Sequence, residues 1–125
     1  MKPEIKEVSS LKDLRTFIRY PKKLYKGNPY WVPTLFADDY STLRWDQNPA
    51  FEHCEAKYWL AYQDGKLVGR IAAIYNKLYQ QHWGNNYGRF NWFDFIDDPD
   101  VSSTLLETAE NWLKGFKVEA IHGPL

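Results

Sequence analysis

The sequence predicts an α+β fold in which a mixed, mostly antiparallel sheet is flanked by helices. Two apolar runs joined by Asp64-Gly65 are typical of a β-hairpin, because this dipeptide adopts the tight turn that joins antiparallel strands. Aromatic residues dominate 89–96, which favours a strand, and apolar residues recur at helical spacing over 99–116. We therefore expect the element order β-α-α-β-β-β-α-β.

The N-terminal region is predicted to hold a short strand over 5–8 and a helix over 11–19. Ser10 lies where a serine caps a helix N-terminus, and the apolar residues after it keep helical spacing. We expect Pro21 to interrupt this helix, because proline lacks a backbone N–H and clashes with the preceding turn. Residues 22–25 then add at most a short further turn.

The next region is predicted to be less regular. We expect 30–33 to be extended and 34–45 to be helical. An Asn-Pro pair marks a turn within 46–50, and 51–55 is expected to be a loop.

The remaining strands and helix are predicted at 58–62, 66–76, 89–96, 99–116 and from 118 onward. Gly69 interrupts an apolar strand, which indicates a bulge or a close backbone approach. Strict alternation along the fourth strand would place Phe90 and Trp92 on one face and Phe93 and Phe95 on the other.

Composition disfavours several classes of partner. The 16 basic and 16 acidic residues give a formal net charge of zero, whereas nucleic-acid binding needs a basic surplus. No apolar run reaches the length of about 20 residues that crosses a bilayer. The single cysteine, Cys54, agrees with a reducing cytoplasm. The histidines and the cysteine lack zinc-ligand spacing, so no metal site is expected.

The junction before the last helix is strongly acidic. Asp94, Asp97, Asp98 and Asp100 surround Pro99 where a strand passes into a helix, and the turn contains no glycine. Such a turn holds a phosphate when it offers free N–H groups and the positive end of a helix dipole. Here Pro99 lacks an N–H group, and the carboxylates repel an anion.

Four segments carry a resemblance to a known family. They read LYKGNPYWVP (24–33), NPAFEH (48–53), DGKLVGRIAA (64–73) and IDDP (96–99). With the element order, they resemble the N-terminal part of bacterial GNAT-like proteins of uncharacterised function, within the N-acetyltransferase superfamily.

The resemblance implies where a coenzyme and an acceptor would lie. Acyl-CoA would bind along the fourth strand, at Trp92, Phe93, Asp94 and Phe95. The acceptor groove would be bordered by aromatic residues of the second region, with Tyr25, Tyr30 and Trp31 as candidates.

The family's pyrophosphate loop, Gln/Arg-x-x-Gly-x-Gly/Ala, maps to 97–102, where none of its residues is present. Each carboxylate about 5 Å from a pyrophosphate charge costs roughly 1–3 kcal/mol at an effective dielectric near 20. As an N-cap, Asp98 would also occupy an N–H that the phosphate needs. We expect no cofactor in this chain, and acetyl-CoA only if the superfamily activity is retained.

The domain is expected to be a single GNAT-like unit, 1–125, incomplete at its C-terminus and a fragment of a longer protein, because the family fold continues past the fifth strand. An uncovered sheet edge invites pairing. We therefore expect a homo-oligomer, or contact with a C-terminal half of the same protein.

The sequence leaves three functions open, and it assigns no catalytic residue. The first is an acyltransferase-related domain without a coenzyme loop. The second is an active N-acetyltransferase with an atypical phosphate contact at Arg70 or Arg89. The third is a non-enzymatic module that binds a peptide or small molecule through its aromatic residues between Tyr25 and Tyr40.

Overall fold

The structure is a computed structural model that describes residues 2–27, 36–77 and 87–123. Its elements are β1 (Glu4–Glu7), α1 (Leu11–Leu24), α2 (Phe36–Leu43), the 3-10 helix η1 (Pro49–Glu52), β2 (Cys54–Gln63), β3 (Lys66–Asn76), β4 (Tyr87–Phe95), α4 (Pro99–Lys114) and β5 (Ala120–His122). The predicted order of strands and α-helices is confirmed. The expected extended segment 30–33 lies outside the described residues.

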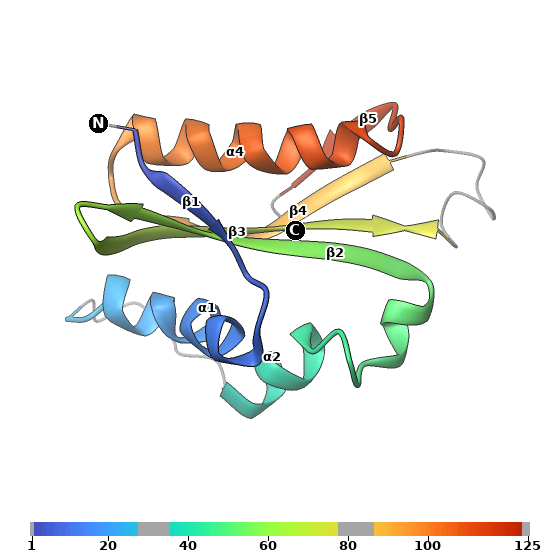
Figure 1. Ribbon diagram of the computed structural model, residues 1–125, viewed down its shortest axis with the longest axis horizontal. Coiled ribbons are helices and arrows are strands. Elements are labelled where there is room, and N and C mark those ends of the chain that lie inside the picture. Colours follow the sequence, from blue (N-terminus) through green and yellow to red (C-terminus); the bar gives the residue numbers. More distant parts are fainter. Residues whose placement is uncertain (1, 28–35, 78–86, 124–125) are drawn as a thin grey trace.

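The strands form one sheet in the order β1-β2-β3-β4-β5. The first three pairings are antiparallel, and β4 and β5, which α4 connects, are parallel. Figure 1 shows α4 on one face of the sheet and α1 and α2 on the other. The predicted fold class, a mixed and mostly antiparallel sheet flanked by helices, is therefore confirmed.

The β2–β3 hairpin closes as predicted. Asp64 and Gly65 have φ angles of 49° and 77°, and Gln63 pairs with Lys66 across the turn. Positive φ at both central residues is the geometry that Asp-Gly favours between antiparallel strands. β2 is longer than predicted, because Cys54 to Lys57 also pair with β3.

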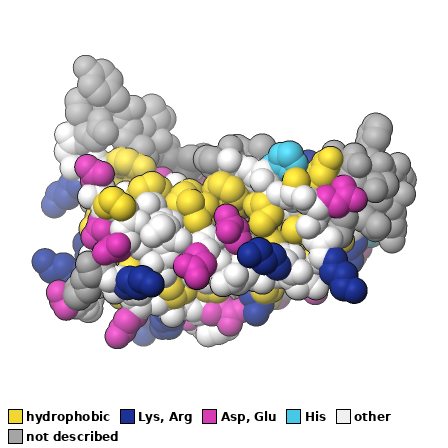
Figure 2. Space-filling model, turned by 90° about the horizontal axis from the view of Figure 1, so that it is seen from above, with side chains coloured by type: hydrophobic (Ala, Val, Ile, Leu, Met, Phe, Trp, Pro, Cys, Tyr) yellow, Lys and Arg dark blue, Asp and Glu magenta, His cyan; other side chains and the backbone are white. Residues whose placement is uncertain are grey.

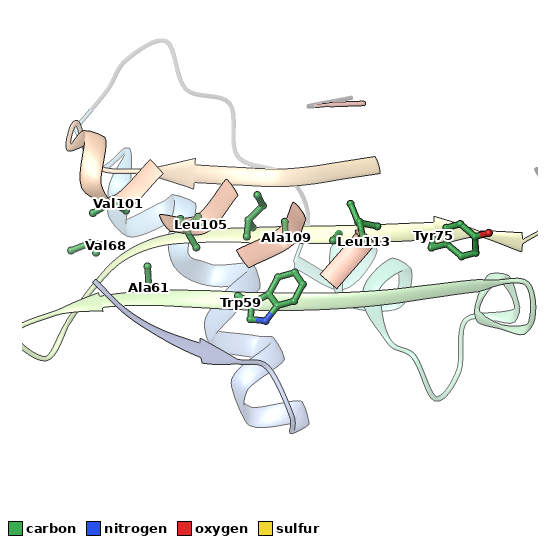
Figure 3. Packing of buried hydrophobic residues seen from close by; sticks show 10 residues of the cluster. Trp59, Ala61, Val68, Tyr75, Val101, Leu105, Ala109 and Leu113 are labelled. Carbon is green, nitrogen blue, oxygen red and sulfur yellow. The ribbon is translucent and has the colours of Figure 1, made fainter. Parts of the chain in front are cut away.

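One hydrophobic core lies between α4 and the sheet. Every fourth residue of α4 is buried there: Val101, Leu105, Ala109 and Leu113. Figure 3 shows them directed toward buried side chains of β2 and β3. A Cβ on Gly69 would lie 2.7 Å from Leu105 Cδ1, so a side chain, and not the predicted backbone, approaches this glycine closely. The register of β2 and β3 shifts beside Gly69, between Ala61 and Tyr62, which agrees with the predicted alternative of a bulge.

A second core lies on the opposite face, beneath α1. Leu14 and Phe17 of this helix are fully buried against Tyr58 and Leu60 of β2 and Ala72 of β3. Ser10 caps the helix as predicted, since its hydroxyl oxygen accepts the Asp13 N–H at 3.1 Å. α1 therefore has a fixed position over the middle of the sheet.

Two boundary predictions are wrong. Pro21 does not interrupt α1, which continues to Leu24, because a side chain from the sheet takes the place of the missing N–H. The segment 51–55 is not a loop, because η1 ends in it at Glu52 and β2 begins in it at Cys54.

The predicted alternation along β4 is confirmed for Trp92, Phe93 and Phe95, but it is wrong for Phe90, which does not share the face of Trp92. Phe90, Phe93 and Phe95 all pack against the α4 core, whereas Trp92 packs against the α1 core. The register with β3 shifts between Arg70 and Ala72, so β4 contains one extra residue there. Such a bulge changes which face the following side chains occupy.

The surface over α4 carries charged side chains of both signs, with hydrophobic side chains among them (Figure 2). Figure 2 views the molecule from the α4 side and shows acidic and basic side chains interspersed. Among the described residues, no helix is long and apolar enough to span a membrane.

Candidate functional site

The turn between β4 and α4 is the position at which the sequence predicts a closed phosphate site. Asp98 is the N-cap of α4 and Pro99 is its first residue, both as predicted. The Asp98 Oδ1 atom accepts the Asp100 N–H at 2.9 Å. Its Oδ2 atom accepts a hydrogen bond from Gln63 Nε2 at 3.1 Å. Both oxygens of this carboxylate therefore have partners within the protein.

The backbone donors of the same turn are also engaged. The N–H of Asp98 donates to the Ile96 carbonyl at 2.7 Å, and those of Val101 and Ser102 donate to the Asp98 carbonyl at 3.1 and 3.2 Å. The Asp100 N–H donates to the Asp98 side chain, and Pro99 has no N–H group. Each backbone N–H from 98 to 102 is therefore either hydrogen-bonded within the protein or missing. A phosphate at this turn would have to displace internal hydrogen bonds.

The carboxylate of Asp98 is held in its ionised form. The hydrogen bond from Gln63 is the largest influence that lowers the pKa of Asp98 below its usual value of 3.8, and the Asp100 N–H adds to it. Hydrogen bonds to the charged form of a carboxyl group favour that form. The turn therefore carries negative charge at neutral pH.

A buried ion pair joins β3 to β4 at the bulge of β4. Arg70 Nε and Nη2 lie 2.9 and 2.7 Å from Asp94 Oδ2. The side chain of Arg70 is 6% exposed and that of Asp94 is 20% exposed. The Tyr25 hydroxyl donates to Asp94 Oδ1 at 2.9 Å. Asp94 thus joins β3, β4 and the C-terminal end of α1.

Arg70 also explains why α1 continues through Pro21. In a regular helix the N–H of residue 21 would donate to the carbonyl of Phe17, four residues earlier. Proline has no such N–H, and Arg70 Nη1 donates to the Phe17 carbonyl instead, at 2.8 Å. The helix keeps this carbonyl satisfied through a residue 49 positions along the chain from Pro21.

Two aromatic rings enclose the same guanidinium. Arg70 Cζ lies 5.0 Å from the ring centroid of Phe17 and 5.5 Å from that of Trp92. Trp92 has a φ of 53°, and its N–H donates to Asn91 Oδ1 at 2.8 Å. The strained backbone at Trp92 is therefore supported by a local hydrogen bond and by the cation beneath its ring.

Burial controls the titration of this cluster. Desolvation is the larger effect on Arg70 and lowers the pKa of its guanidinium, which Asp94 opposes. The ordinary value is so high that the group stays charged at neutral pH. Burial, with a smaller contribution from Asp94, raises the pKa of Tyr20 to about 12. The Tyr20 hydroxyl is buried and has no hydrogen-bond partner among the described residues.

The residues predicted to contact acyl-CoA do not form one surface. Trp92 faces the α1 side of the sheet, while Phe93 and Phe95 face the α4 side. Asp94 is engaged by Arg70 and Tyr25. Whether a coenzyme uses this strand stays a prediction.

The acceptor-groove candidates are only partly described. Tyr25 is half-buried beside Asp94, whereas Tyr30 and Trp31 lie outside the described residues. Tyr40 packs at the margin of the α1 core, with Arg44 Cζ 5.2 Å from its ring centroid.

Sequence reasoning missed the Arg70–Asp94 pair and treated Arg70 as a phosphate contact. Its burial and its partners argue against that role. A signal was present: Arg70 is the charged residue within the apolar run 67–75, and buried charges require partners. Within the ranges 2–27, 36–77 and 87–123, no cluster of three or more His, Cys, Asp or Glu side chains forms that could hold a metal ion.

Comparison with curated proteins gives two relatives. The chain is 38% identical over 112 residues to Protein YghO of Escherichia coli, covering 90% of this chain and 28% of that protein. It is 36% identical over 103 residues to the bacterial ceramide synthase of Caulobacter vibrioides, covering 82% of this chain and 27% of that protein. The chain thus spans just over a quarter of the length of either relative. No family model matches the chain.

Solved structures resemble the chain in fold. An aminoglycoside acetyltransferase from an uncultured soil metagenomic sample, in complex with trehalose, superposes with a TM-score of 0.63 at 9% identity, over 98% of this chain and 77% of its own. A predicted acetyltransferase of Clostridium acetobutylicum, solved with acetyl-CoA, gives 0.62 at 13% identity, over 96% and 79%. With the sheet order and the helices on its two faces, these likenesses establish that the chain has the GNAT acetyltransferase fold.

Proposed function

We propose that this chain is a GNAT-fold domain with a closed coenzyme site, and that it forms the non-catalytic N-terminal part of a longer N-acyltransferase. The observation that carries the proposal is the β4–α4 turn. The carboxylate of Asp98 is negatively charged, and both of its oxygens and the neighbouring N–H groups are already hydrogen-bonded. A diphosphate would meet repulsion, and the backbone from 98 to 102 offers it no free N–H donor.

The substrate class of the longer protein is proposed from one relative. A ceramide is the amide of a fatty acid with a long-chain amino alcohol, so a ceramide synthase forms an N-acyl bond. The relative of that name is 36% identical to this chain. The solved acetyltransferases share the fold of this chain. We propose that the longer protein transfers a fatty acyl group to the amine of a long-chain amino alcohol, and that residues beyond this chain bind the acyl-CoA.

Isothermal titration calorimetry tests the closed site. The 125-residue chain is titrated with acetyl-CoA and with palmitoyl-CoA, after circular dichroism has established that it is folded. We expect no saturable binding at micromolar concentrations. Tight binding of either coenzyme in the presence of a metal chelator would contradict the proposal.

A variant with two fewer carboxylates separates the two reasons why a coenzyme would not bind at this turn. These reasons are repulsion by the carboxylates and the lack of free backbone N–H donors. D97N/D100N removes two carboxylates but keeps the Asp98 cap and its hydrogen bonds. We expect this variant to remain without binding, because the backbone donors are still engaged. If D97N/D100N binds acetyl-CoA while the unmodified chain does not, carboxylate repulsion alone closes the site.

The role in the longer protein has its own test. Acyl transfer from palmitoyl-CoA to sphinganine is measured with the full-length protein and with its D97N/D100N form. We expect equal rates, because the proposal places the reacting groups elsewhere. A loss of transfer in the variant would place this turn in the active site. An absence of transfer in the unmodified protein would reject the substrate class and leave the closed site untouched.

A further inference from the structure

A groove of about 470 Å³ lies between α1 and the turn of the β2–β3 hairpin. Arg19, Tyr20 and Lys23 line it from α1, and Tyr62, Lys66 and Leu67 line it from the two strands. Tyr62 and Leu67 pack with the α1 core, so the groove opens on the face of the sheet opposite α4. It is therefore separate from the turn at Asp98.

The charged residues that line this groove are all basic. Arg19 and Lys23 are one helical turn apart on α1, and Lys66 approaches from the hairpin. Arg19 already has an interaction partner within the protein. Lys23 and Lys66 form no ion pair with any described residue. Asp64, although it precedes the turn glycine, does not line the groove. The two lysines thus offer positive charge to an anion.

The rest of the groove is apolar or aromatic. Tyr62 and Leu67 are paired residues of adjacent strands and form its floor on the sheet side, and Tyr20 lines it from the helix. Its volume lies within the range of sites for small organic molecules, which combine an apolar surface with a few placed charges. Two lysines at the rim suit a doubly charged group better than a carboxylate, since attraction rises with the charge of the ligand.

We propose that this groove binds a phosphate ester that carries an apolar or aromatic group, with the phosphate at Lys23 and Lys66 and the apolar group against Tyr62 and Leu67. The inference does not depend on the proposed function, because it concerns the other face of the sheet.

Nuclear magnetic resonance of the ¹⁵N-labelled chain tests the proposal. Phenyl phosphate and dihexanoyl phosphatidic acid, below its micelle concentration, are titrated separately. We expect saturable shifts of the Gly65 and Leu67 amides with at least one of them. Tighter binding of the phosphatidic acid indicates a lipid as the natural source, and tighter binding of phenyl phosphate indicates a soluble ester. An absence of saturable shifts at these amides with both probes overturns the proposal.

Matched variants test the assignment of the two charges. K23Q/K66Q is expected to weaken binding by about tenfold, because each removed charge contributes to attraction at contact distance. K12Q/K114Q removes two exposed lysines outside the groove and is expected to leave binding unchanged. Equal losses in the two variants would show non-specific attraction and reject the site. Inorganic phosphate binding as tightly as phenyl phosphate would reject the apolar half of the proposal.

Discussion

At the residue scale, Arg70 has three distinct roles. It neutralises Asp94, satisfies the carbonyl that Pro21 leaves open, and lies between two aromatic rings. A buried ion pair is not by itself strong evidence of stability, because desolvation opposes the attraction. Removing one partner is different, because it leaves the other charge buried and uncompensated.

The variant D94A is therefore expected to destabilise the fold by about 3–5 kcal/mol, the usual cost of breaking a buried pair. Urea denaturation followed by circular dichroism measures this free energy. The exposed pair between Arg44 and Asp46 supplies a control, and D46A is expected to have a much smaller effect. Similar losses in the two variants would mean that burial does not govern the Arg70 pair.

Asp98 predicts a specific pH dependence. Its pKa in the folded chain lies below the usual 3.8, so its stabilising contribution is present above pH 3.8 and is lost as the pH falls through the folded value. D98N should be less stable than the unmodified chain at pH 7, and the difference should narrow in acid. Urea midpoints measured from pH 7 to pH 2 check this, and a difference that stays constant with pH would contradict it.

At the element scale, the contact between α4 and β3 depends on a missing side chain. Gly69 allows Leu105 and Val101 to lie against the strand, where an added Cβ would be 2.7 and 3.0 Å from their nearest atoms. Both neighbours are fully buried, so neither can move aside without disturbing the core. α4 therefore lies as close to the sheet as its side chains allow.

G69A is expected to cost about 1–3 kcal/mol, as overpacked cores usually do. The double variant G69A/L105A should lose less than the sum of the two single variants, because shortening Leu105 removes the closest clash. Urea denaturation of the three variants gives the coupling free energy. Strict additivity would show that the helix adjusts without strain.

The effects of substitutions at Pro21 and Arg70 on the free energy of unfolding are also expected to be coupled. P21A restores an N–H that can donate to the Phe17 carbonyl. In the R70M background this carbonyl has lost its donor, so P21A should be more favourable there, by about 1 kcal/mol, the net value of a typical hydrogen bond. A double-mutant cycle in urea measures the difference, and equal effects of P21A in both backgrounds would reject the compensation.

The sequence predicted what depends on neighbouring residues. The Asp64-Gly65 turn, the Ser10 cap and the Asp98-Pro99 start of α4 are set by local backbone preferences, and the structure confirms all three. The order of strands and helices along the chain followed from these boundaries. The fold class was predictable because it depends on this order.

The failures concern long-range contacts. Nothing near Pro21 in the sequence indicates that Arg70 will satisfy the open carbonyl of α1. The bulge at Trp92 depends on the pairing of β4 with β3, and it places Phe90 on the same face as Phe93 and Phe95 instead of on the face of Trp92. At the candidate site, the Asp98 cap was predictable, but the hydrogen bond from Gln63 required knowledge of how the hairpin lies beside α4.

At the scale of the whole molecule, the two edges of the sheet differ. β1 has charged residues at three of its four positions, Glu4, Lys6 and Glu7, and charge on an edge strand discourages pairing. β5 is three residues long and pairs with only the first part of β4. We propose that the β4–β5 side, rather than β1, accepts a further strand from another chain or from the rest of a longer protein.

Light scattering coupled to size-exclusion chromatography tests this proposal. The chain is expected to associate with rising concentration, while a variant that adds charge to β5, A120K, should associate less. The matched variant E4K changes the charge of the β1 edge and should associate as the unmodified chain does. A monomer at all concentrations, or equal effects of A120K and E4K, would contradict an interface at β5.

The position of Arg70 has a mechanical consequence. Its guanidinium contacts a backbone carbonyl of α1, a carboxylate of β4 and the rings of two aromatic side chains at the same time. We therefore expect the last turns of α1 and the bulged part of β4 to move together, because a displacement of either one would strain the contacts that Arg70 makes with the other.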